Sequence, residues 1–490
     1  MTAPTAERPR WLTKHVFLQA LECPRRGWLL HHAARGESMP GLGAQFRLAQ
    51  GNDIGDRARA LFAPGVDLRG PATPAWVSEG ARCLDDPSTA TLFEVPVLAG
   101  HAMARPDVLV RDAGGWRVIE VKSAKTAKPE LVDDLAYTVA VVQAAGLPVT
   151  GAELALVNPD WRVDNGAPPV VRHDVSDKAL ARAGEFAPIL ETIYSAVSAD
   201  AAPPAMLAAV CRNCDFRGVD CFVDGPRDPV FELPGIRSRK VDDWIAGGIT
   251  RIVHVPESEK LTPVQAFHRR AVLAGDLVTD AAGLARLRDV REPAAYLDFE
   301  TLSLALPPFP GVAPYDVLPI QYSLHRRTPA GLEHAEWLLD PARPDLEQFT
   351  RRLLDALAGA ASIVVYSSFE RLRLEWLAAR YPQHADALAD AVARLVDLLP
   401  IVQSAVAHPN FHGSLSIKKV LPVFVDESEL TYRGLEIANG DDATGAAGLR
   451  AMGRIADAEW DRCRAQLLAY CRVDTLAMVR LHEALLALAP

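Results

Sequence analysis

The stretch AAYLDFETL, residues 294–302, is typical of a β-strand that carries two acids on one face. Asp298 and Glu300 are two residues apart, and side chains at that spacing on a strand point to the same side. The apolar residues between and around them would pack against the core. Alone, the pair also fits two solvated acids at the end of a strand, so its meaning depends on the rest of the chain.

A second acid follows a predicted strand in SIVVYSSFERLRLEWLAARY, residues 362–381. The strand turns through two serines into an amphipathic helix, and we expect Leu372, Leu374 and Leu377 on its apolar side. Glu370 falls in the first turn of this helix, where the helix dipole favours an acid. A simple capping role is therefore the alternative to a catalytic one.

The third element is the long helix predicted near the C-terminus, which contains AYCRVDTLAMVRL, residues 469–481. Tyr470 and Asp474 are four residues apart, so they share one face of a helix. A buried tyrosine above a salt-bridged aspartate is the structural alternative. Asp397, in RLVDLLPIV, is a further carboxylate between these elements, and we interpret it as supportive rather than as a ligand.

The order of these motifs resembles the DEDD exonuclease superfamily of the ribonuclease H-like fold, in its tyrosine subclass. The resemblance implies that Asp298, Glu300, Glu370 and Asp474 hold two divalent cations and that Tyr470 orients or deprotonates the attacking water. Hard carboxylate oxygens suit Mg²⁺ or Mn²⁺. Glu370 departs from the family pattern, which usually has Asp there, so its longer side chain would shift the metal.

PDVLVRDAGGWRVIEVKSAK, residues 106–125, is typical of a β-hairpin. If Ala113 and Gly114 form a two-residue turn, Asp107 lies directly opposite Glu120, and Lys122 joins their face. A turn one residue later would preserve that face. Two acids opposite one another are destabilising unless a cation lies between them.

Asp107, Glu120 and Lys122 match the core of the PD-(D/E)xK nucleases, although such a match also occurs by chance in surface hairpins. The resemblance implies that the two acids hold Mg²⁺ and that Lys122 positions water or stabilises developing phosphorane charge. Asp56, upstream, is an additional weak candidate ligand. RecB-like members usually carry a Gln-x3-Tyr helix after the lysine, and Tyr137 and Gln143 do not match that pattern.

CRNCDFRGVDC, residues 211–221, holds three of the seven cysteines of the chain. A local Cys₄ zinc ribbon would need a second nearby pair, which the sequence lacks. An upstream Cys23 plus Cys211, Cys214 and Cys221 resembles the iron–sulfur staple of RecB-like CRISPR-associated exonucleases and related helicase-nucleases. The resemblance implies a [4Fe–4S] cluster, with Zn²⁺ as the alternative. We interpret the remaining cysteines as packing residues.

The whole-chain features are those of a globular protein. The 490 residues predict two or three domains, and the hydrophobic fraction of 49% and charged fraction of 23% are ordinary. The first residues lack an apolar segment and no apolar run could span a membrane, so we expect no secretion signal, no membrane partner and a cytoplasmic location. The net charge of −10 requires any nucleic-acid-binding surface to be local.

Taken together, the motif order resembles a bacterial family of predicted RecB-like nucleases with an appended C-terminal domain of unknown function. We therefore expect an α/β protein with a restriction-endonuclease-like PD-(D/E)xK domain at 1–225, a helical connection at 226–290 and a ribonuclease H-like exonuclease domain at 291–490. The expected function is metal-dependent hydrolysis of phosphodiester bonds, with DNA as the main partner and 3′–5′ exonuclease polarity. The alternatives are a single active C-terminal site on DNA or RNA, with the first domain as a clamp, and a non-catalytic nucleic-acid-binding scaffold.

Overall fold

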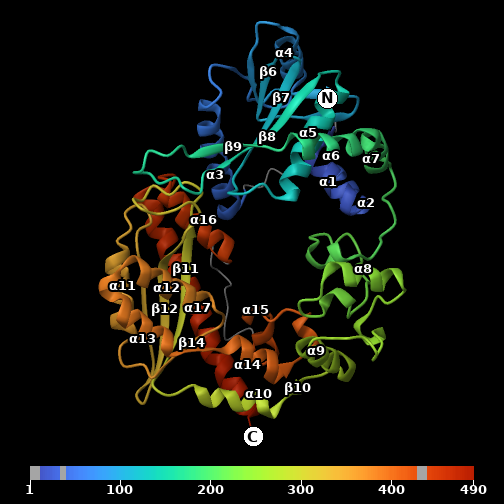
Figure 1. Ribbon diagram of the computed structural model, residues 1–490. Helices are drawn as coiled ribbons and strands as arrows, with labels where there is room; N and C mark the ends of the chain where they lie inside the picture. The colour runs from blue at the N-terminus through green and yellow to red at the C-terminus, as the bar shows by residue number, and fades with distance from the viewer. Residues whose placement is uncertain (1–10, 34–39, 427–436, 438, 490) are drawn as a thin grey trace, which may run out of the picture. The chain divides into compact units, whose positions relative to one another are not determined.

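The computed structural model describes residues 11–33, 40–426, 437 and 439–489 (Figure 1). It confirms a mixed α/β structure. The chain forms two compact units. Unit 1 consists of residues 1–39, 47–206 and 304–316, and unit 2 consists of residues 40–46, 207–303 and 317–490. The expected boundaries at 225 and 290 both fall within unit 2.

The described helices include none that is both long enough and apolar enough to cross a bilayer. The first residues, which bear on the expected absence of a secretion signal, lie mostly at positions 1–10, outside the described part of the chain.

Unit 1 is built around a six-stranded sheet in the order β2-β3-β6-β7-β8-β9, with a second, three-stranded sheet in the order β1-β5-β4. The strands are β1 (Leu12–Thr13), β2 (Val66–Asp67), β3 (Thr91–Phe93), β4 (Val97–Ala99), β5 (Ala102–Ala104), β6 (Val108–Asp112), β7 (Gly115–Lys122), β8 (Val149–Val157) and β9 (Val170–Asp174). The helices are α1 (Lys14–Glu22), α2 (Pro24–His32), α4 (Pro74–Asp85), α5 (Pro129–Ala144), α6 (Ser176–Phe186) and α7 (Leu190–Ser198), and α3 (Leu42–Ala60) has its first residues in unit 2.

The predicted hairpin is present with the predicted register. Strands β6 and β7 are antiparallel, and Asp112 pairs with Gly115 around the two-residue turn. Val108 pairs with Ile119, so the next residue outward on each strand is Asp107 and Glu120. Helix α5 then carries the chain to β8, which lies parallel to β7. The middle of α5 is fully buried against the sheet, which fixes the helix beside the open end of the hairpin.

Two pairs of consecutive helices in unit 1 are separated at a proline. The segment after Leu12 forms α1 and α2, separated at Cys23, whose extended backbone precedes Pro24. Likewise, α6 and α7 are separated by a short 3₁₀ turn that contains Pro188. Proline lacks the amide hydrogen that a continuous helix would need at these positions.

Unit 2 contains a five-stranded sheet in the order β13-β12-β11-β14-β15 and a small β10-β16 pair. The strands are β10 (Val278–Thr279), β11 (Ala294–Ser303), β12 (Val317–Thr328), β13 (Gly331–Leu338), β14 (Ser362–Val365), β15 (Leu395–Asp397) and β16 (Val406–Ala407). The helices are α8 (Ser238–Ala246), α9 (Pro263–Ala274), α10 (Ala281–Ala285), α11 (Leu346–Leu357), α12 (Phe369–Arg380), α13 (Ala385–Ala393), α14 (Leu398–Ala405), α15 (Ile417–Val420), α16 (Gly440–Ala451) and α17 (Asp457–Leu488).

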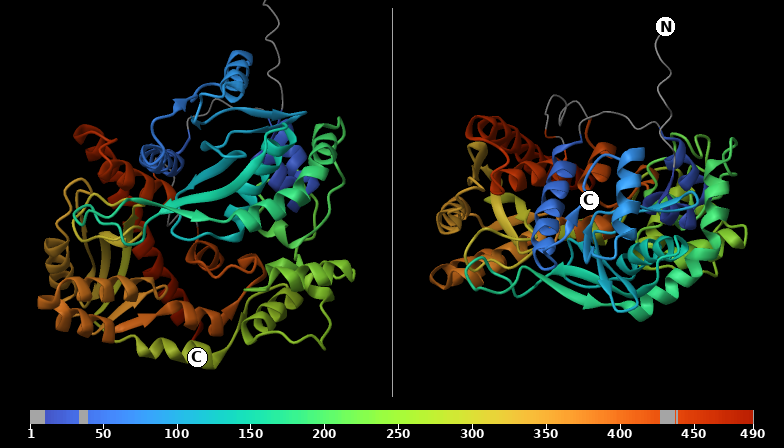
Figure 2. Two further views of the ribbon diagram at one scale, coloured as in Figure 1. Left: turned by 45° about the horizontal axis from the view of Figure 1, so that its top comes forward. Right: turned by 90° about the horizontal axis from the view of Figure 1, so that it is seen from above.

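Helices cover both faces of the sheet in unit 2, and the alternation of side chains along β12 shows which helix covers which face. Gln321 donates to the carbonyl of Leu467, so the odd-numbered side chains face α17. The even-numbered Tyr322 donates to the carbonyl of Arg352, so that face meets α11. The long helix α17 runs along the sheet in Figures 1 and 2 and contacts both β11 and β12.

Candidate functional sites

The two acids of β11 lie on the face of the sheet that α17 covers. Asp298 pairs with Ser323 and Glu300 pairs with Gln321 in the antiparallel β11–β12 ladder. Paired residues project to the same side, and Ser323 is hydrogen-bonded to Thr475 of α17 at 2.9 Å. The predicted shared face of Asp298 and Glu300 is therefore confirmed, and that face looks toward the helix that carries Tyr470 and Asp474.

Lys418 of α15 joins Tyr470 and Asp474, and sequence reasoning missed it. Its Nζ donates to Tyr470 Oη at 2.5 Å and lies 3.8 Å from Asp474 Oδ1. The ammonium also lies 4.7 Å from the centre of the Tyr470 ring. One lysine thus contacts both members of the predicted helix face. The segment SLSIKKVLP is rich enough in lysine to have suggested a basic role, but nothing in its spacing points to Tyr470.

Glu370 is placed by the start of α12, as the sequence predicts. Its side chain is buried, and Ser367 Oγ lies 3.5 Å from its Oε2. Leu374 and Leu377 are buried on the same helix, but Leu372 is exposed, so the predicted apolar side was wrong at that position. Leu372 is two residues before Leu374, about 200° around the helix axis, so it lies on the opposite, exposed side.

The charges of these acids act on one another. Burial, then Asp474, Glu300 and Glu370, raise the pKa of Asp298 well above its usual value. Burial and Asp474 raise the pKa of Glu300 to about 8. Burial raises the pKa of Glu370 to about 7, and Asp397 adds to the shift. Acids from β11, α12 and α17 therefore converge closely enough to disfavour their simultaneous ionisation.

Asp397 has a structural role of its own. It ends β15 and accepts a hydrogen bond from the Leu399 amide at 2.9 Å, which caps α14. Its negative charge also contributes to the raised pKa of Glu370.

The hairpin of unit 1 brings Asp107, Glu120 and Lys122 together. Asp107 accepts a 2.6 Å hydrogen bond from the Val121 amide, which fixes its carboxylate across the hairpin. Lys122 Nζ lies 3.3 Å from Glu120 Oε2. A second cation, Lys14 at the start of α1, donates to the same oxygen at 2.9 Å. The predicted cluster is present, and it contains a lysine that the sequence analysis did not identify.

Helix α5 completes this cluster with Asp134 and Thr138. Asp134 pairs with Lys122 at 2.5 Å, and Thr138 Oγ1 donates to Glu120 Oε1 at 2.7 Å. These residues are four apart, so they share the face of α5 that looks at the hairpin. Tyr137, compared above with the Gln-x3-Tyr pattern, is buried with its hydroxyl donating to the Leu12 carbonyl.

The two acids of this cluster are shifted in opposite directions. Burial and the charge of Glu120 raise the pKa of Asp107. Burial alone would raise the pKa of Glu120 as well, but Lys14 and Lys122 outweigh burial and lower it. Burial would lower the pKa of Lys122, but Glu120 and Asp134 reverse this and raise it. The cluster at neutral pH therefore holds an ionised Glu120 between two ammonium groups.

Glu94 lies in the connection after β3, upstream of the hairpin. Its negative charge contributes to the raised pKa of Asp107. It lies 2.9 Å from Arg105 Nε and has a left-handed backbone with φ of 55°. The weakly favoured Asp56 instead pairs with Arg59 at 2.5 Å and Arg69 at 3.1 Å. An acid between apolar residues in FEVPV was the available sequence signal for Glu94.

The four cysteines of the expected iron–sulfur staple are divided between the units. Cys23 lies between α1 and α2 in unit 1, whereas Cys211, Cys214 and Cys221 lie in unit 2. The unit 2 cysteines belong to a tight loop in which the Cys221 amide donates to the Phe216 carbonyl at 2.9 Å. Cys471 is buried, and Cys83 is partly buried against the core of unit 1. Shared ligation by Cys23 and the other three stays a prediction.

Within the described ranges, no group of three or more His, Cys, Asp or Glu side chains is arranged to hold a metal ion. The described acids of unit 2 are thus within electrostatic range of one another, while no three of them are arranged around a common metal position.

Comparison with known families covers the first part of the unit 2 site. The model of a domain of unknown function, DUF2779, matches residues 295–416. That range includes Asp298, Glu300 and Glu370 and ends before Lys418, Tyr470 and Asp474. Its description names no activity.

Curated proteins of two mycoplasmas are similar to part of the chain. "Uncharacterized protein MG366 homolog" of Mycoplasma pneumoniae is 29% identical over 213 residues, which is 39% of this chain and 32% of that protein. "Uncharacterized protein MG366" of Mycoplasma genitalium is 28% identical over 211 residues, which is 39% of this chain and 31% of that protein. The chain thus spans about a third of the length of these relatives. No solved structure matches it.

Proposed function

We propose that this chain is a metal-dependent nuclease that hydrolyses phosphodiester bonds of DNA, with one hydrolytic site in each unit. The observation that carries the proposal is the convergence of Asp298, Glu300, Glu370 and Asp474 from three separate elements. Packing alone does not require such convergence, and without cations the mutual repulsion costs stability. The same acids motivate the finer proposal of a ribonuclease H-like, DEDD-type 3′–5′ exonuclease in unit 2 and a restriction-endonuclease-like PD-(D/E)xK site in unit 1.

The donor sets fit the proposed cofactors by their chemistry. Carboxylate oxygens at both clusters suit Mg²⁺ or Mn²⁺, and Asp298, Glu300, Glu370 and Asp474 would hold the cations in unit 2. In unit 1 the corresponding ligands would be Asp107 and Glu120. Bound divalent cations supply an activated water and stabilise the leaving oxygen. Among the described residues no three of these carboxylates are arranged to hold a metal ion, so ligation of a cation by all four would draw them closer together.

The side chains of the protein have separate tasks in this reaction. In unit 2, Tyr470 orients the attacking water through its hydroxyl, and Lys418 fixes that hydroxyl by donating to Oη. In unit 1, Lys122 stabilises negative charge that develops on the phosphoryl oxygens. Asp134 holds the Lys122 ammonium in place at 2.5 Å.

The test is a nuclease assay of the full chain with Mg²⁺ or Mn²⁺ on single- and double-stranded DNA and RNA. Asp298→Asn inactivates the unit 2 site and Lys122→Ala inactivates the unit 1 site. Each single variant should leave the products of the other site, and Lys122→Ala should slow the unit 1 reaction by about 10²–10³-fold. Absence of divalent-metal-dependent cleavage by the unaltered chain on all four substrates would reject the proposal in favour of a non-catalytic scaffold.

One observation favours a second candidate, in which only the unit 2 site is active and unit 1 is a binding clamp. Glu120 already pairs with Lys14 and Lys122, so two ammonium groups compete with any cation for its carboxylate. In this case Lys122→Ala changes affinity for nucleic acid and leaves every cleavage product in place.

For the cysteines we propose a [4Fe–4S] cluster, with Zn²⁺ as the alternative, and the cluster takes no part in hydrolysis. Thiolates are suitable donors for either. The test is the iron and zinc content of protein purified without oxygen. Cys23→Ala should lose the metal as fully as Cys214→Ala, and retention of full metal by Cys23→Ala would exclude a four-cysteine staple.

A further inference from the structure

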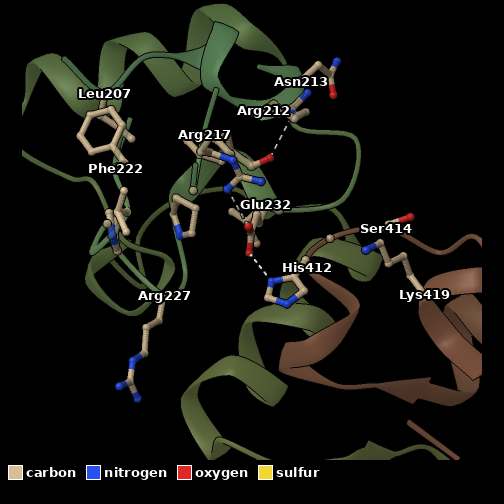
Figure 3. A pocket seen from close by; sticks show the side chains of 18 of the residues that line it. Leu207, Arg212, Asn213, Arg217, Phe222, Arg227, Glu232, His412, Ser414 and Lys419 are labelled. Carbon is tan, nitrogen blue, oxygen red and sulfur yellow. Dashed lines mark hydrogen bonds and ion pairs between the residues drawn. The ribbon is translucent and has the colours of Figure 1, made fainter. Parts of the chain in front are cut away.

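Unit 2 contains a pocket of about 700 Å³ between the cysteine loop and the segment that leads into α15 (Figure 3). This volume is within the range of small-molecule sites, about 300–1,000 Å³. The charged residues that line it are Arg212, Arg217, Arg227, Glu232, His412 and Lys419. Four permanent cations against one carboxylate make the pocket locally positive in a chain whose net charge is −10.

Three of these charged side chains, Arg212, Arg217 and Glu232, make contacts that hold the walls of the pocket together. Glu232 is buried and lies 3.1 Å from both Arg217 Nη1 and His412 Nδ1, so it joins the two walls. Arg212 donates to the carbonyls of Phe231 and Ile236, both at 2.9 Å. In Figure 3, Lys419 and Arg227 extend from opposite sides of the pocket. Both are exposed, and among the described residues neither side chain has a hydrogen bond or ion pair.

Two residues that line the pocket have a left-handed backbone, and one of them, His412, ends a short 3₁₀ turn. Only four non-glycine residues of the described chain have a left-handed backbone, and two of them line this pocket: Phe222 with φ of 54° and His412 with φ of 49°. A bulky residue in this conformation costs about 1–3 kcal/mol and is concentrated at ligand sites. Gly413 holds His412 against the wall, because a Cβ on Gly413 would lie 1.7 Å from the Glu232 carbonyl oxygen.

The pocket adjoins the proposed hydrolytic site of unit 2 through α15. Lys418 and Lys419 are neighbours in this helix, so their side chains diverge by about 100° around its axis. Lys418 reaches Tyr470 and Asp474, whereas Lys419 lines the pocket. Adjacent residues of α15 therefore contribute one ammonium to the Tyr470 site and one to the pocket.

We propose that this pocket binds a nucleotide unit of a single nucleic-acid strand whose neighbouring phosphodiester reaches the Tyr470 site. Lys419 and Arg227 bind phosphate oxygens, and the Phe222 ring supplies a surface for a base. Basic grooves with aromatic platforms are how proteins hold single strands without reading sequence. This inference rests on the proposed function, because it takes the unit 2 cluster as the site toward which the strand runs.

The test is binding of a fluorescein-labelled oligothymidylate of about 12 nucleotides to the full chain in EDTA, measured by anisotropy at about 50–200 mM salt. Arg227→Ala and Lys419→Ala should each reduce the slope of log affinity against log salt by about 1. Phe222→Leu should weaken binding about fivefold or more and leave that slope unchanged, because it removes stacking and no charge. Arg351→Ala and Lys260→Ala, which remove exposed cations outside the pocket, are the matched controls.

Each outcome decides a separate point. If Arg227→Ala and Lys419→Ala match their controls in affinity and salt slope, the pocket does not bind the strand, whatever the nuclease assay shows. If they weaken binding while the unaltered chain cleaves nothing, the pocket assignment holds and the proposed hydrolysis fails. If thymidine 5′-monophosphate binding depends on the pocket and oligonucleotide binding does not, the pocket binds a free nucleotide and the strand proposal is wrong.

Discussion

In unit 1, Glu120 lies 2.9 Å from Lys14 and 3.3 Å from Lys122, and the two cations share Asp134 as a further partner. In unit 2, the acids raise one another's pKa, and Lys418 lies 3.8 Å from Asp474 at the edge of the cluster. The buried carboxylate of Glu120 in unit 1 is therefore stabilised by neighbouring cations, whereas the carboxylates of unit 2 are destabilised by one another. We expect an acid-to-amide change to have opposite effects on stability at the two places.

The largest effect is expected for Asp298→Asn. It should reduce cleavage at the unit 2 site by about 10²–10³-fold or more, as loss of one preorganised electrostatic group does. In EDTA near pH 8 it should raise the melting temperature, because it removes a repelled charge. Added Mn²⁺ should stabilise the unaltered chain by binding its folded state and should stabilise this variant much less. Calorimetry of the full chain, with Asp355→Asn as an exposed control, measures both shifts; a lower melting temperature in EDTA would contradict the repulsion.

Glu120→Gln should act in the opposite direction. It leaves Lys14 and Lys122 with Asp134 as their one remaining shared carboxylate, and breaking a buried ion pair costs about 3–5 kcal/mol. Urea unfolding of the full chain, followed by a probe in unit 1, gives this free energy. Glu130→Gln, at an exposed position at the start of α5, should change it little. If Glu120→Gln instead stabilised the protein, the expected opposite effects on stability in the two clusters would be wrong.

The pH dependence should differ in the same way. Glu300 has a pKa of about 8 in the folded chain against 4.5 as its usual value, so between these pH values the folded state binds more protons than the unfolded state. Stability in EDTA should therefore fall as pH rises from about 5 to 8, by about 2–4 kcal/mol. Glu300→Gln should flatten this slope, which denaturant melts at several pH values would detect. An equal slope in Glu300→Gln would assign the pH dependence to other groups.

Tyr470→Phe should have the smallest effect of these changes. It keeps all four carboxylates and the ring beneath Lys418, and it removes the hydroxyl that Lys418 contacts. Cleavage at the unit 2 site should fall by about 10²-fold while the stabilisation by Mn²⁺ stays unchanged. If the metal effect is lost as well, Tyr470 holds the acids in place and does not act on water.

The parts of these sites that the sequence predicts are those set by local periodicity. The register of the hairpin follows from its two-residue turn, and the face of Asp298 and Glu300 follows from the alternation of a strand. Lys14 and Lys418 reach their partners through tertiary packing, over sequence separations that no local pattern encodes. Asp134 and Thr138 had a local signal, their i and i+4 spacing on a helix, but they do not match the Gln-x3-Tyr pattern expected there.

The division of the chain has a consequence for its synthesis. Residues 304–316 belong to unit 1, although they follow β11 of unit 2, and Ser123, next to Lys122, bonds to Tyr315 at 2.7 Å. Domains generally fold as the ribosome releases them, from the N-terminus onward. Unit 1 cannot be completed until residue 316 has left the ribosome, after the whole of β11 has been made. A nascent chain arrested before Leu304 should therefore be more sensitive to protease around Ser123 than one arrested beyond Asp316.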